Sequence, residues 1–316
     1  MNAGWRPSYQ RRGFVTFKSE SAAKPFSLST LEDAPALARR LCLSLGKVTA
    51  REEAVRIIAE AVTAHGPGNA PVIHHVRLTG GRLERVTGSG DPPPEAPAIG
   101  QWVGTVVELG PDEFWAGIHR HAALVSPDPG GSGFLMLPDD APSRAWLKLE
   151  EAARFFGLRF SPRDIAVELG CAPGGVIHAL LQRNVSVIGV DPAKLAPVVM
   201  ARAVPGVPGP PHGTPWVFHC RKPAALVAKR DLGTRVTWFL SDMNQSPAVA
   251  LKECARFVRM CPSIRSALIT LKLTDLSQIV EKPAWFRSLH EMGFKTVRLQ
   301  QLSVHNRELA LLALDR

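Results

Sequence analysis

A glycine-rich stretch offers the clearest chemistry in this sequence, because it combines acidic residues with a backbone that a ligand can approach. The stretch ELGCAPGG at 168–175 follows an apolar strand pattern at 164–169 and precedes a helix pattern at 174–184. A second apolar strand pattern at 185–190 ends at Asp191. Glycines allow close approach of backbone to ligand, and an acid after the second strand can hold a ribose diol. The residues predicted to form a nucleoside-binding site are Glu168, Gly170, Cys171, Pro173, Gly174, Gly175 and Asp191.

The loop lacks the features of the common phosphate-binding motifs. A dinucleotide motif needs a second glycine where Ala172 stands, and here Pro173 follows. A P-loop ends in Gly-Lys-Ser/Thr, whereas Gly175 is followed by Val176. S-adenosylmethionine (SAM) carries no phosphate, so the loop favours SAM over NAD, FAD or a nucleoside triphosphate. The alternative interpretation is a tight strand-to-helix turn without a ligand.

Four further segments carry a more specific pattern. They are PDDAPSRAWLKLEEA at 138–152, WFLSDM at 238–243, ITLKL at 269–273 and HNREL at 305–309. Together with the glycine-rich loop, they resemble the catalytic domain of FtsJ/RrmJ-type ribose 2'-O-methyltransferases, and most closely the RlmM branch. That branch modifies a cytidine of large-subunit ribosomal RNA and uses a Lys-Asp-Lys-Glu tetrad. The resemblance runs from about residue 113 to the C-terminus and implies catalytic roles for Lys148, Asp242, Lys272 and Glu308, with Asp242 also contacting the cofactor.

The implied reaction needs a base, because a ribose 2'-hydroxyl is a very weak acid. A neutral lysine amine could take its proton, although the ordinary lysine pKa is about 10.4. Burial and a second cation would lower that value. We therefore hypothesise that Lys272 is the general base and that Lys148 lowers its pKa and stabilises the developing alkoxide. Asp242 would orient the amine, and Glu308 would position Lys148 or the ribose.

Positive charge is concentrated in the part of the chain that contains these motifs. The net charge is −1 over residues 1–140 and +11 over residues 141–316. A basic catalytic half suits a polyanion such as RNA, because neutralising phosphates supplies affinity. The resemblance implies ribosomal RNA or a pre-ribosomal particle as the partner. A basic enzyme surface without a nucleic-acid partner is the alternative.

Composition narrows the class of protein further. The longest apolar runs are strand-sized, so we expect no transmembrane helix and no membrane partner. The N-terminus lacks the apolar region of a signal peptide, and five cysteines without paired CxxC spacing indicate reduced thiols. We expect a cytoplasmic protein. The histidines lack a completing ligand set, so no metal site is predicted.

The elements that must position these residues follow from the alternation of apolar patterns. From Ser143 the chain predicts a leading helix to Gly157 and then strands alternating with helices. This predicts an α/β domain with a doubly wound, mostly parallel, seven-stranded Rossmann-like methyltransferase sheet, whose last two strands form an antiparallel hairpin. Its rim would collect the site residues. The predicted strands span 164–169, 185–190, 215–219, 235–241, 264–273, 294–304 and 307–314.

The remaining part predicts a smaller N-terminal α+β domain at 1–137, with the methyltransferase domain at 138–316. A hinge-like run at 128–133 marks the boundary. The resemblance implies a THUMP-type RNA-binding module in the N-terminal domain, shorter than the family pattern and with its start missing. The predicted elements are a loose basic arm or frayed terminus at 1–12, strands at 13–18, 72–78, 102–109 and 114–121, and helices at 30–45 and 51–64.

Two alternative functions remain open from the sequence. One is 2'-O-methylation of another RNA, such as transfer RNA. The other is a SAM-binding or RNA-binding ribosome assembly factor without catalysis, which a complete tetrad disfavours.

Overall fold

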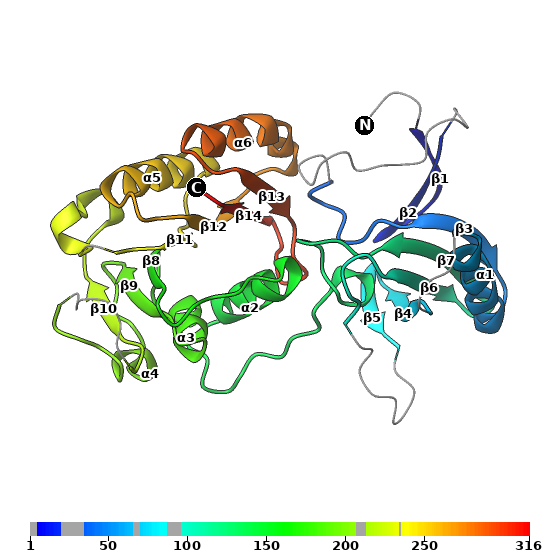
Figure 1. The fold of residues 1–316 in the computed structure, drawn as a ribbon, viewed down its shortest axis with the longest axis horizontal. Coiled ribbons are helices and arrows are strands. Elements are labelled where there is room, and N and C mark those ends of the chain that lie inside the picture. Colours follow the sequence, from blue (N-terminus) through cyan, green and yellow to red (C-terminus); the bar gives the residue numbers. More distant parts are fainter. Residues whose placement is uncertain (1–4, 20–34, 66–69, 87–95, 207–212, 234) are drawn as a thin grey trace. The chain divides into compact units, whose positions relative to one another are not determined.

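The computed structural model describes residues 5–19, 35–65, 70–86, 96–206, 213–233 and 235–316. The chain divides into two compact units (Figure 1). The larger unit comprises Ala34–Leu37, Leu135–Arg154 and Leu158–Arg316, and the smaller comprises Met1–Asp33, Ala38–Phe134 and Phe155–Gly157.

The larger unit is built on a seven-stranded sheet with the order β10-β9-β8-β11-β12-β14-β13. Strand β14 runs antiparallel to both of its neighbours, whereas the pairs from β10 to β12 are parallel. Strands β8 and β9 are buried along their whole length, as expected for a parallel sheet covered on both faces. The predicted α/β sheet and its final hairpin are confirmed. The strands are β8 (Ile165–Leu169), β9 (Ser186–Val190), β10 (Val217–Cys220), β11 (Trp238–Ser241), β12 (Ser266–Lys272), β13 (Thr296–Gln300) and β14 (Glu308–Leu314).

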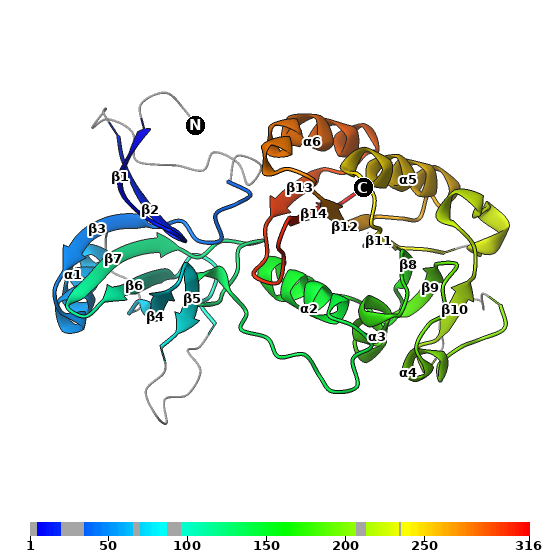
Figure 2. The ribbon, with the colours of Figure 1, turned by 180° about the vertical axis from the view of Figure 1, so that it is seen from behind.

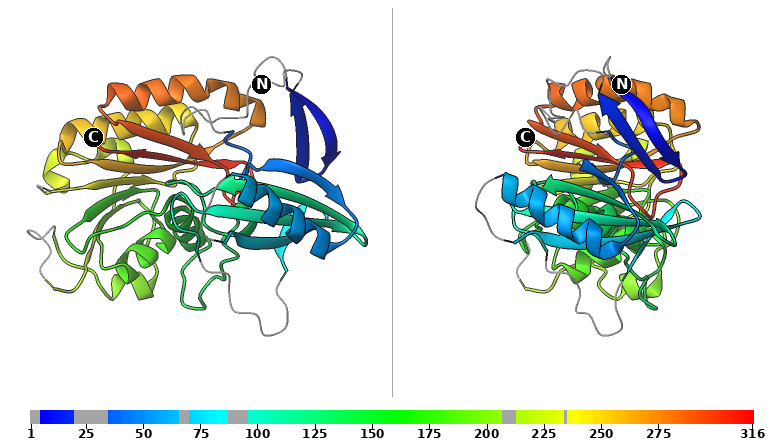
Figure 3. Two further views of the ribbon diagram at one scale, coloured as in Figure 1. Left: turned by 45° about the vertical axis from the view of Figure 1, so that its right-hand side comes forward. Right: turned by 90° about the vertical axis from the view of Figure 1, so that its right-hand side faces the viewer.

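Helices cover both faces of this sheet (Figure 2). Helices α2 (Ala145–Phe156) and α3 (Gly175–Gln182) lie on one face, and α5 (Pro247–Met260) and α6 (Lys282–Glu291) lie on the other (Figure 3). Helix α5 begins at a proline, whose fixed φ suits the first turn. Shorter helices are α4 (Pro197–Met200), η3 (Ala224–Leu226), η4 (Lys229–Asp231) and η5 (Leu276–Glu281).

An apolar core fixes the sheet against α5 and α6. Phe239 of β11 and Phe257 of α5 are fully buried, and their ring centroids lie 5.6 Å apart. Trp285 and Leu289 of α6 belong to the same buried cluster. Each buried side chain of this size stabilises the folded state by about 1.5–3 kcal/mol. This packing holds the strands rigidly, so the residues at their ends are held in place as well.

The smaller unit contains a five-stranded sheet with the order β3-β7-β6-β4-β5 and a separate two-stranded sheet of β1 and β2. Helix α1 packs on the larger of these sheets through Ala54, Ile58 and Val62, which recur at helical spacing. A short helix, η2 (Pro129–Gly131), is also buried in this unit. The other elements are β1 (Trp5–Arg11), β2 (Phe14–Ser19), β3 (Leu43–Val48), α1 (Arg51–Ala64), β4 (Val72–Thr79), β5 (Arg82–Arg85), β6 (Trp102–Gly110) and β7 (Glu113–Arg120).

Two local predictions for the N-terminal part were wrong. The described part of the predicted helix at 30–45 is not helical, and residues 30–34 lie outside the described residues. Leu43 and Leu45 alternate at strand spacing, and antiparallel pairing with β7 stabilises this segment as a strand instead of a helix. Residues 5–11 of the predicted loose arm form β1, because β2 offers an antiparallel partner. The run at 128–133 contains the buried helix η2, and the change from the smaller to the larger unit follows between Phe134 and Leu135.

Candidate active site

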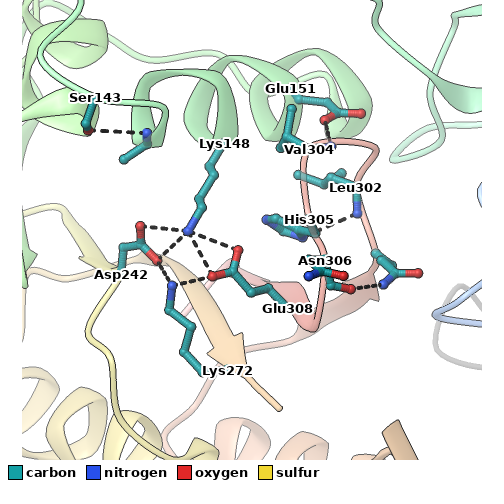
Figure 4. A network of polar contacts seen from close by, with 12 residues as sticks. Ser143, Lys148, Glu151, Asp242, Lys272, Leu302, Val304, His305, Asn306 and Glu308 are labelled. Atoms are coloured by element: carbon teal, nitrogen blue, oxygen red, sulfur yellow. Dashed lines mark hydrogen bonds and ion pairs between the residues drawn. The ribbon is translucent and has the colours of Figure 1, made fainter. Parts of the chain in front are cut away.

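Four charged side chains from three strands and one helix meet on one face of the larger sheet (Figure 4). Lys272 ends β12 and pairs directly with Glu308, the first residue of β14. Asp242 follows β11, two residues beyond Leu240, which pairs with Leu268 of β12. Side chains alternate along a strand, so Asp242, Lys272 and Glu308 project from the same face. Helix α2 covers this face and extends Lys148 toward them.

The four residues form a closed network of ion pairs. Lys148 Nζ lies 3.1 and 3.0 Å from the two carboxylate oxygens of Asp242. It also lies 3.1 and 3.0 Å from the two oxygens of Glu308. Lys272 Nζ lies 2.9 Å from Asp242 Oδ1 and donates a hydrogen bond to Glu308 Oε1. These side chains are only 12–22% exposed, so water screens the pairs less than it would at the surface.

The carboxylates control the protonation of Lys272. Burial alone would lower the Lys272 pKa, but the hydrogen bond that Lys272 donates to Glu308 and the charge of Asp242 outweigh it and raise that pKa. Burial likewise opposes the charged form of Glu308, but hydrogen bonds from Lys272 and Lys148 hold the Glu308 pKa below its ordinary value. The expectation of a lowered Lys272 pKa was therefore wrong for the free protein. Two carboxylates contact the amine, and their attraction exceeds the effect of burial.

Two glycines of the 168–175 loop allow it to fold tightly beside β11. Gly170 has φ +73°, and a Cβ there would lie 2.9 Å from the Cα of Met243. Gly174 has φ +111°, and a Cβ there would lie 2.8 Å from Val199. A larger residue at either position would combine an unfavourable φ with a steric clash. Gly175 begins α3, so the loop leads directly into a helix N-terminus.

Asp191 joins the glycine-rich loop to the segment after β9. Its Oδ2 accepts a hydrogen bond from the Ala172 N–H at 3.2 Å, and its Oδ1 accepts one from the Ala193 N–H at 2.8 Å. The carbonyl of Pro173 accepts from the Ala196 N–H at 2.9 Å. Each carboxylate oxygen can accept a second hydrogen bond, so Asp191 keeps capacity for a ligand hydroxyl.

The two remaining predicted residues of the loop are buried and differ in chemistry. Glu168 is 2% exposed, and burial, with added repulsion from Asp242 and Asp191, raises its pKa well above the ordinary value. Its Oε2 has no hydrogen-bond partner among the described residues. Burial, followed by repulsion from Glu168, raises the pKa of Cys171, so this thiol stays protonated and is not an activated nucleophile.

Sequence reasoning missed two residues that support the tetrad. Glu151 is buried on α2, and its carboxylate accepts hydrogen bonds from the Ser303 and Val304 N–H groups at 2.8 and 2.9 Å. These contacts fix the connection before β14 against the helix that carries Lys148. His305 lies on this connection and lines a cavity together with Lys148, Glu168 and Asp242. A carboxylate on the apolar side of a helix was the available signal for Glu151. For His305, the sequence predicts only a short connection between the strands at 294–304 and 307–314.

Within the described parts of the chain, no three His, Cys, Asp or Glu residues are grouped so that they could hold a metal ion. None of the described helices has the length and apolar character needed to cross a bilayer.

Comparison with known proteins adds the family context. Residues 141–267 match the family model of the FtsJ-like methyltransferases, which confirms the resemblance for that segment. A curated relative from Azotobacter vinelandii, Ribosomal RNA large subunit methyltransferase M, is 33% identical over 173 residues, covering 51% of this chain and 44% of the relative. The protein of the same name from Teredinibacter turnerae is 31% identical over 186 residues, covering 54% and 46%. The matches thus span less than half the length of these relatives.

Proposed function

We propose that this protein is an enzyme that transfers a methyl group from SAM to a ribose 2'-hydroxyl of RNA. The convergence of Lys148, Asp242, Lys272 and Glu308 into one network carries the proposal. Surface charges that are unrelated in function would not meet from three strands and a helix beside a nucleoside-type loop. The family match over 141–267 and the names of the curated relatives support the same reaction class.

The residues beside the tetrad fit SAM as the cofactor. Gly170 and Gly174 leave the loop backbone without side chains, and Asp191 has acceptor capacity suited to a ribose diol. Asp242, at the end of β11, would attract a cationic group of the cofactor. When bound, SAM supplies an electrophilic methyl carbon on a positively charged sulfur. Glu168, Cys171, Pro173 and Gly175 would complete the cofactor side of the site.

The tetrad would activate the acceptor hydroxyl. In the free protein Lys272 is held as an ammonium group by Glu308 and Asp242. A bound ribose that hydrogen-bonds to these carboxylates would weaken their hold, and the Lys272 pKa would fall. Lys272 then releases its proton to solvent, and the neutral amine takes the proton of the 2'-hydroxyl, while the Lys148 ammonium stabilises the negative charge that develops on oxygen. Such acid–base help contributes about 10²–10⁴-fold to the rate.

The substrate class follows from charge and from the relatives. Residues 141–316 carry a net charge of +11, which suits a polyanion. The curated relatives are named as large-subunit ribosomal RNA methyltransferases. We therefore propose large-subunit ribosomal RNA as the substrate and a cytidine as the target nucleotide. The reaction would take place in the cytoplasm. Residues 1–137, which supply most of the smaller unit, would then serve as the RNA-binding domain, and residues 138–316 as the catalytic domain.

A methyl-transfer assay with separate RNA pools tests this function. The protein would be incubated with SAM carrying a labelled methyl group and with large-subunit ribosomal RNA, transfer RNA, intact ribosomal particles or DNA. Label in ribosomal RNA or its particles supports the proposal. Label confined to transfer RNA would assign another substrate to the same chemistry, and SAM binding without label in any pool would favour an assembly factor.

A further inference from the structure

Two residues that each hold an unpartnered buried polar atom, Glu168 and His305, line one cavity beside the tetrad. Its walls include Lys148, Glu168, Asp242 and His305, together with apolar side chains of α2 and β12. His305 is 9% exposed and Glu168 is 2% exposed. Neither His305 Nε2 nor Glu168 Oε2 has a hydrogen-bond partner among the described residues. Figure 4 shows the His305 ring directed from its connection toward the end of Lys148. Buried polar atoms of this kind are normally paired, with protein or with ordered water.

The hydrogen bonding of His305 determines which of its nitrogens carries the proton. Nδ1 accepts from the Leu302 N–H at 3.4 Å. Burial lowers the His305 pKa to about 4, so the ring is neutral near pH 7. A neutral ring that accepts at Nδ1 carries its proton on Nε2. His305 therefore directs a donor toward the cavity, and Glu168 contributes a carboxyl oxygen that can accept.

The size of the cavity limits what can bridge these groups. About 20 Å³ is open to the centre of a water molecule. One water needs roughly 10–15 Å³ by this measure and two to four polar partners. We propose that the cavity binds ordered water, which links His305 Nε2 to Glu168 Oε2.

This water would connect two parts of the site. Glu168 belongs to β8, which leads into the glycine-rich loop, and His305 lies on the connection that leads into Glu308. His305 and Glu168 are then positioning residues, which align the cofactor loop with the tetrad through the bound water. Their effect on catalysis rests on the proposed function, whereas the water site itself does not.

Two substitutions of His305 separate its contacts. His305→Asn keeps an acceptor for the Leu302 N–H but loses the donor at the Nε2 position. His305→Gln places an amide N–H near the Nε2 position. His290→Asn, in α6 on the opposite face of the sheet, is the matched control. High-resolution crystal structures of the full chain and steady-state methylation kinetics would be measured for each.

We expect water within about 3.2 Å of both atoms in the wild-type crystal structure. His305→Asn should lose this water and lower kcat about tenfold, with little change in KM for SAM, because a buried hydrogen bond that orients the tetrad is lost. His305→Gln should recover most of the lost activity, and His290→Asn should resemble wild type. A wild-type cavity without ordered water, or equal kcat in the Asn and Gln variants, would overturn the proposal. If wild type methylates no RNA, the proposed function fails, and the crystal structure still decides on the water site.

Discussion

Lys272 and Glu308 are paired residues on the antiparallel strands β12 and β14, and their side chains form an ion pair although they are 36 positions apart in the chain. The pairing register therefore places the amine beside a carboxylate, independently of any loop. Lys148 and Asp242 then complete the network from a helix and from a strand end. A proton acceptor on a rigid strand keeps its geometry better than one on a mobile segment, which suits a reaction that depends on alignment.

Replacing Lys272 by alanine should abolish methyl transfer while leaving SAM binding nearly unchanged. The amine would be lost, whereas the glycine-rich loop and Asp191 would remain. The rate should fall by about 10²–10⁴-fold. Calorimetric titration with SAM and a labelled-methyl assay would measure both properties, with Lys295→Ala on the exposed surface as control. Full activity of Lys272→Ala would refute the assigned base.

The pH dependence should show that Lys272 is protonated in the free protein. Because the Lys272 pKa is raised, only a small fraction of the amine is neutral near pH 7. As long as the pH is below that pKa, this fraction increases about tenfold with each unit by which the pH rises. The value of kcat/KM for RNA should therefore rise continuously from neutral pH toward the ordinary lysine value of about 10.4. The value of kcat should reach its plateau at a lower pH than kcat/KM does, because bound RNA weakens the contacts of the carboxylates with Lys272. A plateau of kcat/KM near neutral pH would contradict this account.

Asp191 should matter for cofactor binding more than for chemistry. Asp191→Asn removes the charge but keeps one oxygen for the Ala172 or Ala193 N–H. Losing a hydrogen bond to a charged group should weaken SAM binding about 10–100-fold. At saturating SAM, kcat should stay near the wild-type value. Asp139→Asn, at an exposed position, is the control, and an unchanged SAM affinity for Asp191→Asn would remove Asp191 from the cofactor site.

RNA affinity should fall steeply as salt concentration rises. The positive charge of residues 141–316 implies binding through phosphate neutralisation, which releases counterions. A plot of log affinity against log salt, measured by fluorescence anisotropy with a labelled ribosomal RNA fragment, should have a clearly negative slope. A flat response would point to a small-molecule substrate.

Burial of His305 should make the protein less stable in mild acid. Its folded-state pKa of about 4 lies below the ordinary value of 6.5, so the unfolded chain binds a proton first as the pH falls. The free energy of unfolding therefore keeps its full value with respect to His305 above pH 6.5. It falls by as much as ~3 kcal/mol between pH 6.5 and about 4. Guanidinium unfolding of wild type and His305→Gln should show a smaller loss over this range for the variant. Parallel pH profiles would show that His305 titrates normally.

The sequence predicted the catalytic unit well because its signals are local. Fully apolar strands such as 185–190 and the loop ending at Gly175 can be recognised without knowing their partners. The ion-pair network required the resemblance, since nothing in the spacing of Lys148 and Glu308 shows that they touch. The direction of the Lys272 pKa shift could not be predicted from the sequence. It depends on how close the two carboxylates and the neighbouring lysine lie to the amine, and only the structure gives these distances. The strand at Leu43–Val48 was missed because the apolar stripe over 30–45 predicts a helix, and the pairing with β7 that makes Leu43–Val48 a strand cannot be read from local spacing.

Mapping the methylated nucleotide tests the central claim most directly. Large-subunit ribosomal RNA without the modification would be incubated with SAM bearing a labelled methyl group and either wild type or Lys272→Ala, then digested and analysed by mass spectrometry. We predict label on a ribose 2'-oxygen, at a cytidine, with wild type and none with the variant. Label on a base, or equal ribose labelling by both proteins, would contradict the account.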